Sequence, residues 1–490
     1  MRAPLILAID QGTSATKCVL VGADGAIVAR GAAPLGEAHP EPGWVEQDAA
    51  EIWASVQSAT ARCLENIDPA RVAAIGIASQ RESLLLWERD GGAPVSKLLS
   101  WQDQRTAAQC EALRTAASEA LVRARSGLPL DPMFSAAKAR WLLDTYDPDR
   151  RRARAGALCL GTVDSWLLSR FGGDHLIEAG NAARTQLLNV ATIDWDDDLL
   201  ALFAVPRAAL PRIHASTGPF PAARGLAPLP DGVPVMAVMG DSHAALYAHG
   251  ARSPGQVKAT YGTGSSVMGL LAGPENLDPG MCLTIAWQTD RPCYAAEGNI
   301  RASGATLRWL AQLFGRTPEE LAAFAAVSDA TGVVLIPGFT GLGAPYWDRD
   351  AVGLLANLRL DTGPAELARA ALDAMVQQVA DVVAALERTT GPIPALHADG
   401  GPSRSDALMQ MQADALGRPV LRAGDAELSA LGVAHMAGLG AGLWSEAALD
   451  ALPRAADRFA PNIAPAARAA ARARWQHAVA RARIPPPHAP

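Results

Sequence analysis

The chain has 490 residues, of which 49% are hydrophobic and 19% are charged, and its formal net charge is −7. This composition excludes a disordered chain, and the length exceeds what one hydrophobic core usually organises, so two domains are expected. The acidic balance argues against a nucleic-acid partner. The one basic run is predicted to lie in a surface loop, and it comprises Arg150, Arg151, Arg152 and Arg154.

The N-terminus and the cysteines indicate the compartment. Met1 leads straight into the apolar run Leu5–Ile9 without a charged leader or a cleavage site, and no apolar stretch reaches the length of a membrane span. The six cysteines are scattered, with neither zinc-ligand spacing nor a disulfide framework. We therefore expect a cytoplasmic protein that binds no membrane.

The first residues predict strands followed by a helix. Leu5–Ile9 is apolar, Lys17–Val21 alternates in polarity, and Ile27–Arg30 returns after a tight turn, which is typical of a strand meander. Asp48 resembles a helix N-cap, and apolar residues then recur at helical spacing as far as Asn66. A sheet is thus followed by a helix.

An α/β pattern continues through the first half. Val72–Ala78 and Leu84–Glu88 predict buried strands, separated by the polar tetrad Ser79–Glu82. Alanine-rich helical stretches occupy much of 106–146, and Val233–Met239 predicts another buried strand.

The second half begins with a weak internal repeat of the first. Val257–Thr260, a glycine-serine turn and Val267–Leu271 form a second predicted hairpin, which echoes the hairpin around Asp10–Thr16. The segment Ala251–Gly255 has the composition of a linker. The predicted domains are residues 1–248 and 249–490.

Two turns carry candidate phosphate-binding chemistry. In Asp10–Lys17, the Asp10 carboxylate can orient magnesium-bound water, Gly12 lets the backbone approach a phosphate, and Lys17 adds positive charge. The alternative is an ordinary hairpin turn, since such residues are common in turns. Tyr261–Ser266 repeats this chemistry in the second half, and two such loops facing each other across a cleft could bracket the phosphates of a nucleotide.

A third glycine-rich segment precedes a predicted helix. Asp399–Ser405 leads from the short strand Leu396–Ala398 into a helical stretch over Asp406–Leu416, so a purine or a phosphate could lie against its backbone. The alternative is a strand-to-helix turn that needs glycine for its geometry. Gly438–Gly442 is more typical of a helix stop than of a dinucleotide site, which disfavours a nicotinamide-dependent dehydrogenase.

Two strand ends carry candidate catalytic groups. Asp241 follows one buried strand, and the pair Arg81 and Glu82 follows another. A carboxylate that accepts a hydroxyl proton, together with an Arg–Glu pair that binds neighbouring hydroxyls, is what phosphoryl transfer to an alcohol requires. The alternatives are a capped strand end and a surface ion pair. His243 is a second candidate base, although a lone histidine two positions beyond an acid is more often structural.

These motifs together resemble the FGGY family of carbohydrate kinases along nearly the whole chain, and within it the glycerol kinase branch. The matching segments are Asp10–Lys17, Ser79–Glu82, Trp101–Thr106, Gly161–Trp166, Asn181–Thr185, Asp194–Asp196, Gly240–Asp241, Tyr261–Gly264, Phe339–Asp348 and Asp399–Gly401. The resemblance implies an α/β protein with two ribonuclease H-like domains, as in the actin and sugar-kinase superfamily, and a catalytic cleft between them. It also implies a homo-oligomer, a dimer or a tetramer, that binds MgATP and a polyol or sugar.

The resemblance implies roles for individual residues. Asp241 would be the catalytic base, and Asp10 with Asp241 would hold Mg²⁺. The substrate residues would be Arg81, Glu82, Trp101, Met133, Asp241, Ser242 and Ser266. The nucleotide residues would be Thr13, Ser14, Lys17, Thr263, Gly264, Gly304, Gly401 and Ser405.

The sequence departs from the glycerol kinase pattern around the substrate. Met133 stands where those kinases usually have tyrosine, Ser242 where they have glutamine, and Ser266 where they have an aromatic residue. Lys17 replaces an arginine and Ser405 an asparagine. We therefore expect ATP-dependent phosphorylation of a primary hydroxyl on a polyol or sugar larger than glycerol. The alternative is a nucleotide-binding regulatory or scaffolding relative with little kinase activity.

Overall fold

The computed structural model describes residues 3–275, 277–327 and 332–484. The chain divides into two compact units, each assembled from separate stretches of sequence. The first unit comprises the residues up to 250, 283–294 and 427–453, and the second comprises 251–282, 295–426 and the residues from 454 on. None of the described helices combines the length and the hydropathy needed to span a lipid bilayer.

A five-stranded mixed sheet organises the first unit, in the order β13-β5-β1-β2-β3. Strands β1, β2 and β3 are antiparallel, whereas β5 is parallel to β1 and β13 is parallel to β5. The predicted meander and buried strands are confirmed, because nearly every residue of β1 and β5 is buried. The strands are β1 (Leu5–Gln11), β2 (Ala15–Val21), β3 (Ile27–Pro34), β5 (Val72–Ser79) and β13 (Val235–Gly240).

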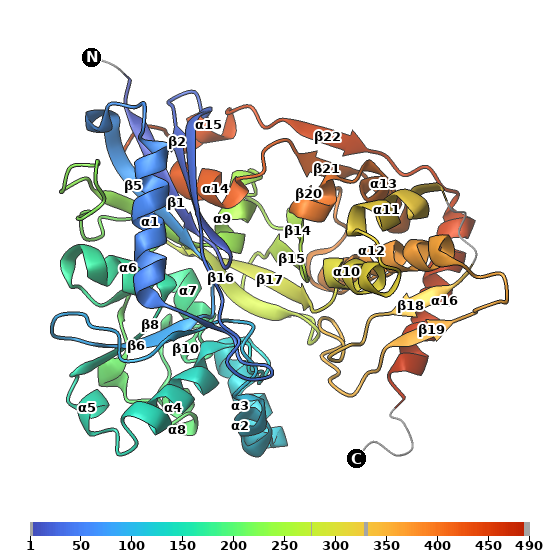
Figure 1. Ribbon diagram of the computed structural model, residues 1–490, viewed down its shortest axis with the longest axis horizontal. Coiled ribbons are helices and arrows are strands. Elements are labelled where there is room, and N and C mark those ends of the chain that lie inside the picture. The colour runs from blue at the N-terminus through green and yellow to red at the C-terminus, as the bar shows by residue number, and fades with distance from the viewer. Residues whose placement is uncertain (1–2, 276, 328–331, 485–490) are drawn as a thin grey trace. The chain divides into compact units, whose positions relative to one another are not determined.

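Helix α1 (Ala49–Cys63) covers β2 and β3 on one face of this sheet (Figure 1). Asp48 is its N-cap, as predicted, and accepts hydrogen bonds from the backbone N–H groups of Ala50 and Glu51. The buried stripe of the helix faces the strands. The helix ends at Cys63 rather than at Asn66, and the chain continues in a turn.

Two helices of the first unit, α9 (Asp241–Ala248) and α14 (Leu428–Gly440), pack against each other, and α14 also packs on β1, β5 and β13. Glycines permit this close approach. A Cβ atom at Gly432 would lie 1.8 Å from the carbonyl oxygen of Ala244, and one at Gly76 would lie 2.5 Å from the carbonyl oxygen of Val433. Helix α14 therefore contacts its neighbours backbone to backbone.

The rest of the first unit consists of a small sheet, two ribbons and short helices. The sheet has the order β4 (Glu46–Gln47), β7 (Leu98–Leu99), β6 (Leu84–Glu88) and β8 (Leu158–Thr162). The ribbons pair β9 (Leu176–Glu178) with β12 (Arg212–His214) and β10 (Leu188–Asn189) with β11 (Asp194–Trp195). The other helices are α2 (Ala107–Leu113), α3 (Ala116–Ser126), α4 (Ser135–Tyr146), α5 (Arg151–Arg154), α6 (Val163–Gly172), α7 (Ala179–Ala183), α8 (Asp197–Leu202) and α15 (Glu446–Asp450).

The basic run that the sequence analysis assigned to a surface loop is instead helical and paired with acids. Helix α5 covers most of it, and Arg150 is buried, with its guanidinium against the carboxylate of Asp144. Arg152 pairs with Glu88, which lies 64 positions earlier in the chain. Arg151, Arg152 and Arg154 are exposed, as predicted, but the predicted loop was wrong because a short helix forms there.

The sheet of the second unit repeats the arrangement of the first, in the order β17-β15-β14-β20-β21-β22. Strands β14, β15 and β17 are antiparallel, β20 is parallel to β14, and β21 is parallel to β20. The internal repeat and the two-domain α/β fold are therefore confirmed. The strands are β14 (Val257–Tyr261), β15 (Ser265–Leu270), β17 (Pro292–Ile300), β20 (Leu396–Asp399), β21 (Val420–Ala423) and β22 (Ala456–Phe459). Strand β16 (Cys282–Gln288) lies almost entirely in residues 283–294, which belong to the first unit.

The long helix α12 (Pro364–Thr390) packs against this sheet, where Gly298 makes room for the side chain of Val382. Buried Asp381 on α12 accepts hydrogen bonds from the side chains of Trp475 (2.7 Å) and Gln476 (2.6 Å), which attach the last helix. The remaining elements are α10 (Gly304–Leu313), α11 (Pro318–Val327), α13 (Asp406–Leu416), α16 (Pro465–Ala482), the ribbon β18 (Val334–Ile336) and β19 (Leu354–Ala356), and 3₁₀ turns at Pro69–Arg71, Arg207–Ala209 and Gly401–Arg404.

Candidate active site

The turn between β1 and β2 carries the first predicted loop. Asp10 lies opposite Lys17 in the antiparallel register, and the Gly12 N–H closes the turn by donating to the carbonyl of Ala15 at 3.1 Å. The side chains of Lys17 and Ser14 are exposed, as phosphate donors need to be. The hydroxyl oxygen of Thr13 accepts a hydrogen bond from the indole N–H of Trp101 at 3.1 Å, so the structure joins two predicted site residues.

Asp10 has the electrostatics of a cation site. Its Oδ1 atom is buried and makes no hydrogen bond to any residue in the described ranges. The pKa of Asp10 is raised to about 7, chiefly by burial and next by the nearby charge of Asp241, against the opposing effect of Lys17. Two neighbouring carboxylates that destabilise each other's charge are stabilised together by a divalent cation.

These residues fit magnesium as that ion is usually held. Among the residues that the structure describes, no group of three or more His, Cys, Asp or Glu side chains could hold a metal ion. Mg²⁺ commonly takes one or two carboxylates and completes its shell with water and phosphate oxygens. Asp10 and Asp241 match that requirement.

Asp241 opens helix α9 directly after strand β13. The backbone N–H of Ser242 donates to its Oδ1 at 2.6 Å, and Nε of Arg81 lies 3.4 Å from the same oxygen. The Asp241 side chain is 36% exposed and can meet a substrate. His243 is fully buried, with Nε2 3.3 Å from Nη1 of Arg81, so its position favours the structural interpretation over that of a base.

Gly240 makes room for the side chain of Arg81. A Cβ atom at this position would lie 2.6 Å from Cδ of Arg81 and 3.0 Å from Nδ1 of His243. A larger residue would therefore displace the guanidinium from Asp241.

Glu82 is held by an arginine that reasoning from the residues did not pair with it. Nε of the fully buried Arg184 donates to Oε1 of Glu82 at 2.5 Å, and the Arg184 guanidinium lies 5.2 Å from the ring centre of Phe134. Glu82 has a φ of 62°, which is strained for a residue with a side chain, and Ser135 donates to its carbonyl at 2.8 Å. Local sequence patterns reveal neither the strain nor the partner.

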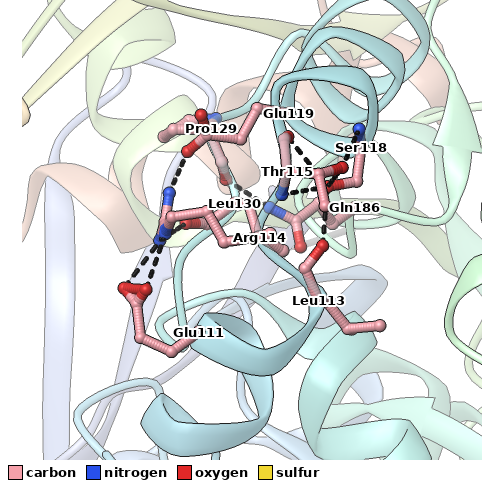
Figure 2. A network of polar contacts seen from close by, with 9 residues as sticks. All are labelled: Glu111, Leu113, Arg114, Thr115, Ser118, Glu119, Pro129, Leu130 and Gln186. Atoms are coloured by element: carbon pink, nitrogen blue, oxygen red, sulfur yellow. Dashed lines mark hydrogen bonds and ion pairs between the residues drawn. The ribbon is translucent and has the colours of Figure 1, made fainter.

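The segment that carries Met133 is fixed by side chains from several elements. Figure 2 shows Arg114, at the end of α2, donating to the carbonyl of Leu130 (3.0 Å) while it pairs with Glu111 and Glu119. Gln186 donates to the carbonyl of Pro129.

Lys138 holds the same segment from helix α4. It donates to the carbonyls of Pro132 and Met133, the latter at 2.8 Å. Burial lowers the pKa of Lys138 to about 8, against the attraction of Asp103 and Asp131. The backbone at the predicted substrate residue Met133 is therefore rigidly positioned.

The second predicted loop lies between β14 and β15, against the start of α10. The backbone N–H groups of Ser303 and Ala305 donate to the carbonyl of Thr263, each at 3.0 Å. Cβ atoms at Gly264 and Gly304 would lie 2.3 and 2.6 Å from backbone carbonyl oxygens, so both positions require glycine. Arg308 donates to the hydroxyl of Thr263 at 2.7 Å, which adds a cation that the sequence analysis missed.

The third loop follows β20. Gly400 has a φ of 92° and a Cβ there would lie 2.0 Å from the carbonyl oxygen of Tyr261, so this glycine is required by the fold. A Cβ at Gly401 would meet no atom of the described residues within 4 Å, which leaves its backbone open to a flat ligand. The Ser405 hydroxyl caps α13 by accepting from the N–H of Leu408 at 3.3 Å.

Ser266 lies on β15 directly opposite Asn299 on β17. Its hydroxyl donates to Oε1 of the fully buried Glu297 at 2.7 Å, and Nδ2 of Asn299 donates to the same oxygen at 3.2 Å. The Oδ1 atom of Asn299 is buried and finds no hydrogen-bond partner among the residues that the structure describes. The surface around Ser266 is therefore hydrophilic. It is not an apolar surface from which only an aromatic side chain is missing.

Comparisons with known proteins cover the whole chain. Residues 5–248 match the N-terminal domain of the FGGY family of carbohydrate kinases, and residues 257–441 match its C-terminal domain. The chain is 43% identical to an apulose kinase of Pectobacterium atrosepticum (99% of this chain, 100% of the relative) and 44% identical to a glycerol kinase of Aromatoleum aromaticum (98% of each). The crystal structure of Plasmodium falciparum glycerol kinase with ADP superimposes with a TM-score of 0.91 at 26% identity, over 98% of this chain and 99% of that one.

Proposed function

This chain belongs to the FGGY family of carbohydrate kinases and is an ATP-dependent carbohydrate kinase, and we propose that it phosphorylates a primary hydroxyl of a ketose or polyol longer than glycerol. Relatives named apulose kinase and glycerol kinase are almost equally similar to the chain. The choice between a sugar and glycerol must therefore rest on the residues.

The contact between Ser266 and Glu297 is the observation that favours the longer substrate. Glycerol kinases have an aromatic residue at this position by the resemblance described above, whereas here a small hydroxyl donates to a buried carboxylate. Asn299 adds an acceptor that has no partner within the described part of the chain. A small and hydrophilic position favours a substrate with further hydroxyl-bearing carbons, because unpaired buried polar groups penalise a ligand that cannot pair with them. We include apulose among the candidates.

We propose that Asp241 accepts the proton of the attacking hydroxyl. Arg81, Glu82, Trp101, Met133 and Ser242 would bind the end of the substrate that reacts. Arg81 lies beside Asp241, and Arg184 holds Glu82, so the charged groups are oriented before the substrate arrives. A weak base suffices, since the loose transition state of phosphoryl transfer needs little proton abstraction.

We propose that the nucleotide is bound by the three glycine-rich loops. Thr13, Ser14 and Lys17 would donate to phosphate oxygens in the domain of residues 1–248. In the domain of residues 249–490, Thr263 and Gly264 would bind the distal phosphates, and Gly304, Gly401 and Ser405 would lie at the nucleoside. Mg²⁺, held by Asp10 with Asp241, would neutralise the charge of the phosphates.

An acceptor panel tests this function. ADP formation is measured with glycerol, erythritol, D-ribulose, D-xylulose and apulose, for the wild type and for Ser266→Phe. We expect kcat/KM for the best four- or five-carbon acceptor to exceed that for glycerol by at least about tenfold, the scale of one or two lost contacts, and Ser266→Phe to reduce this ratio. Glycerol as the best substrate would contradict the larger substrate. No acceptor-dependent ADP formation would favour a regulatory relative.

A further inference from the structure

Five residues of the first unit form a closed ring of hydrogen bonds between two loops of the proposed site. The members of this Gln47–Gln80 ring are Thr13, Gln47, Gln80, Ser83 and Trp101. They come from the β1–β2 turn, from strand β4, from the segment between β5 and β6, and from the segment after β7. Three of them lie outside every role assigned so far.

The ring can be followed from donor to acceptor. The indole N–H of Trp101 donates to Oγ1 of Thr13 (3.1 Å), and Nε2 of Gln47 donates to the carbonyl of Thr13 (2.6 Å). Nε2 of Gln80 donates to Oε1 of Gln47 (2.9 Å), and the hydroxyl of Ser83 donates to Oε1 of Gln80 (2.9 Å). The backbone N–H of Trp101 donates to Oγ of Ser83 (3.0 Å) and closes the ring.

The burial of its middle members makes the ring stiff. Gln47, Gln80 and Ser83 are 2%, 1% and 0% exposed. A buried amide that loses its partner cannot turn to water and leaves an unsatisfied polar group, which costs about 1–3 kcal/mol. Neither loop can therefore shift without either breaking such a bond or moving the other loop.

The ring also orients the hydroxyl of Thr13. An indole N–H is only a donor, so Thr13 Oγ1 acts as an acceptor towards Trp101 and its own proton points elsewhere. Its carbonyl is fixed by Gln47 at the same time. The hydroxyl oxygen of Thr13 is thereby set by Trp101 and its carbonyl by Gln47, the two neighbours of Thr13 in the ring.

We propose that the Gln47–Gln80 ring couples the substrate loop to the phosphate loop, with Gln47 and Gln80 as positioning residues. A substrate that fixes Trp101 would fix the Thr13 hydroxyl for its phosphate oxygen, and a bound nucleotide would fix Trp101 in return. This inference rests on the proposed function, in which Trp101 binds the substrate and Thr13 binds phosphate.

The test measures the coupling directly. The Kd of the ATP analogue AMP-PNP with Mg²⁺ is measured with and without the best acceptor of the panel, in the wild type and in Gln47→Leu. Leucine fills the space but cannot donate to Thr13 or accept from Gln80. We expect the acceptor to tighten AMP-PNP binding at least about fivefold in the wild type. In Gln47→Leu we expect less than twofold tightening and a kcat about tenfold lower, with the acceptor Kd within twofold of the wild type.

Gln57→Leu is the matched control. Gln57 lies in the same unit and also donates its Nε2 to a backbone carbonyl, that of Gly225 at 2.8 Å, but it is not part of the ring. This variant should couple the two ligands as the wild type does. Trp101→Phe is the second test variant, since it keeps an aromatic face and removes the indole N–H, and it should lose the coupling as well.

The outcomes separate this inference from the proposed function. Wild-type coupling and kcat in Gln47→Leu and Trp101→Phe would overturn the inference while an active wild type upholds the function. Equal loss in Gln57→Leu would overturn it too, because the effect would then be general. A wild type that phosphorylates no acceptor would overturn both.

Discussion

The negative charge of Asp241 can be removed without changing how its side chain is held at the start of helix α9. Its Oδ1 accepts from the N–H of Ser242 at 2.6 Å, a bond that an asparagine side-chain oxygen can also accept. Its contact with Arg81 depends on the negative charge. Substitution by asparagine should therefore preserve the start of helix α9 and remove only the charge and the basicity.

We predict that Asp241→Asn lowers kcat about a hundredfold or more, the usual scale for losing a positioned acid–base group. Binding of the nucleotide should change little, because Asp10 and the glycine-rich loops remain. The measurement is steady-state ADP formation together with titration of AMP-PNP. Turnover like that of the wild type would remove Asp241 from the chemistry.

Elements were predictable from the sequence where their pattern is local. Strand β6 begins and ends at the predicted residues Leu84 and Glu88, and helix α13 spans the predicted Asp406–Leu416. The periodicity of hydrophobic residues indicates which face of an element is buried, and capping residues indicate where a helix begins or ends. Such elements can therefore be found without knowledge of the elements that they pack against.

The support of the site was not predictable, because it depends on residues remote in the chain. The bond from Arg184 to Glu82 spans 102 positions, and that from Arg308 to Thr263 spans 45. The positive φ of Glu82 leaves no mark in its residue type. Most site residues were proposed from the family resemblance, and their roles stay predictions.

Lys138 gives helix α4 a predictable dependence on pH. The pKa of its ammonium is lowered from 10.5 to about 8, mainly by burial. Below pH 8 both the folded and the unfolded chain carry the proton, and the folded state bears the cost of the buried charge. Between pH 8 and 10.5 only the unfolded chain keeps it, so the free energy of unfolding rises with pH across this window.

We therefore predict that the stability of the wild type relative to Lys138→Met increases by up to about 3 kcal/mol from pH 7.5 to pH 10, at about 1.4 kcal/mol per pKa unit. Urea unfolding of both proteins at several pH values measures it. Titration of all other groups cancels in the difference. A difference that stays flat would show that Lys138 keeps an ordinary pKa in the folded state, and one that falls with pH would show that this pKa is raised; either would contradict the prediction.

At the scale of the whole molecule, the chain enters its first compact unit three times. Helix α14 belongs to this unit although it follows β13 by nearly two hundred positions. It is buried on almost all sides, with Leu428, Leu431, Val433 and Met436 each less than 9% exposed. The glycines near its end marked a helix stop in the sequence, but nothing local indicated which sheet it would cover.

Because the first unit is assembled from separate stretches of sequence, an N-terminal fragment of the chain should not fold stably on its own. A fragment of residues 1–250 contains the complete five-stranded sheet but lacks residues 283–294 and α14, so the face of β1, β5 and β13 that α14 covers would be exposed to water. Gly76 and Ala244, which lie against the backbone of α14, would lose those contacts. Each Å² of apolar surface that becomes exposed costs about 25 cal/mol. For the whole buried face of a helix, this cost exceeds the free energy of unfolding of a typical domain.

We expect this fragment to aggregate or to bind a hydrophobic dye without a cooperative urea transition, whereas a fragment in which a flexible linker joins residues 427–453 to residue 250 should regain cooperativity. If residues 1–250 alone unfold in one sharp transition, with native-like resistance to protease, helix α14 is dispensable for the first unit and this account of its role is wrong.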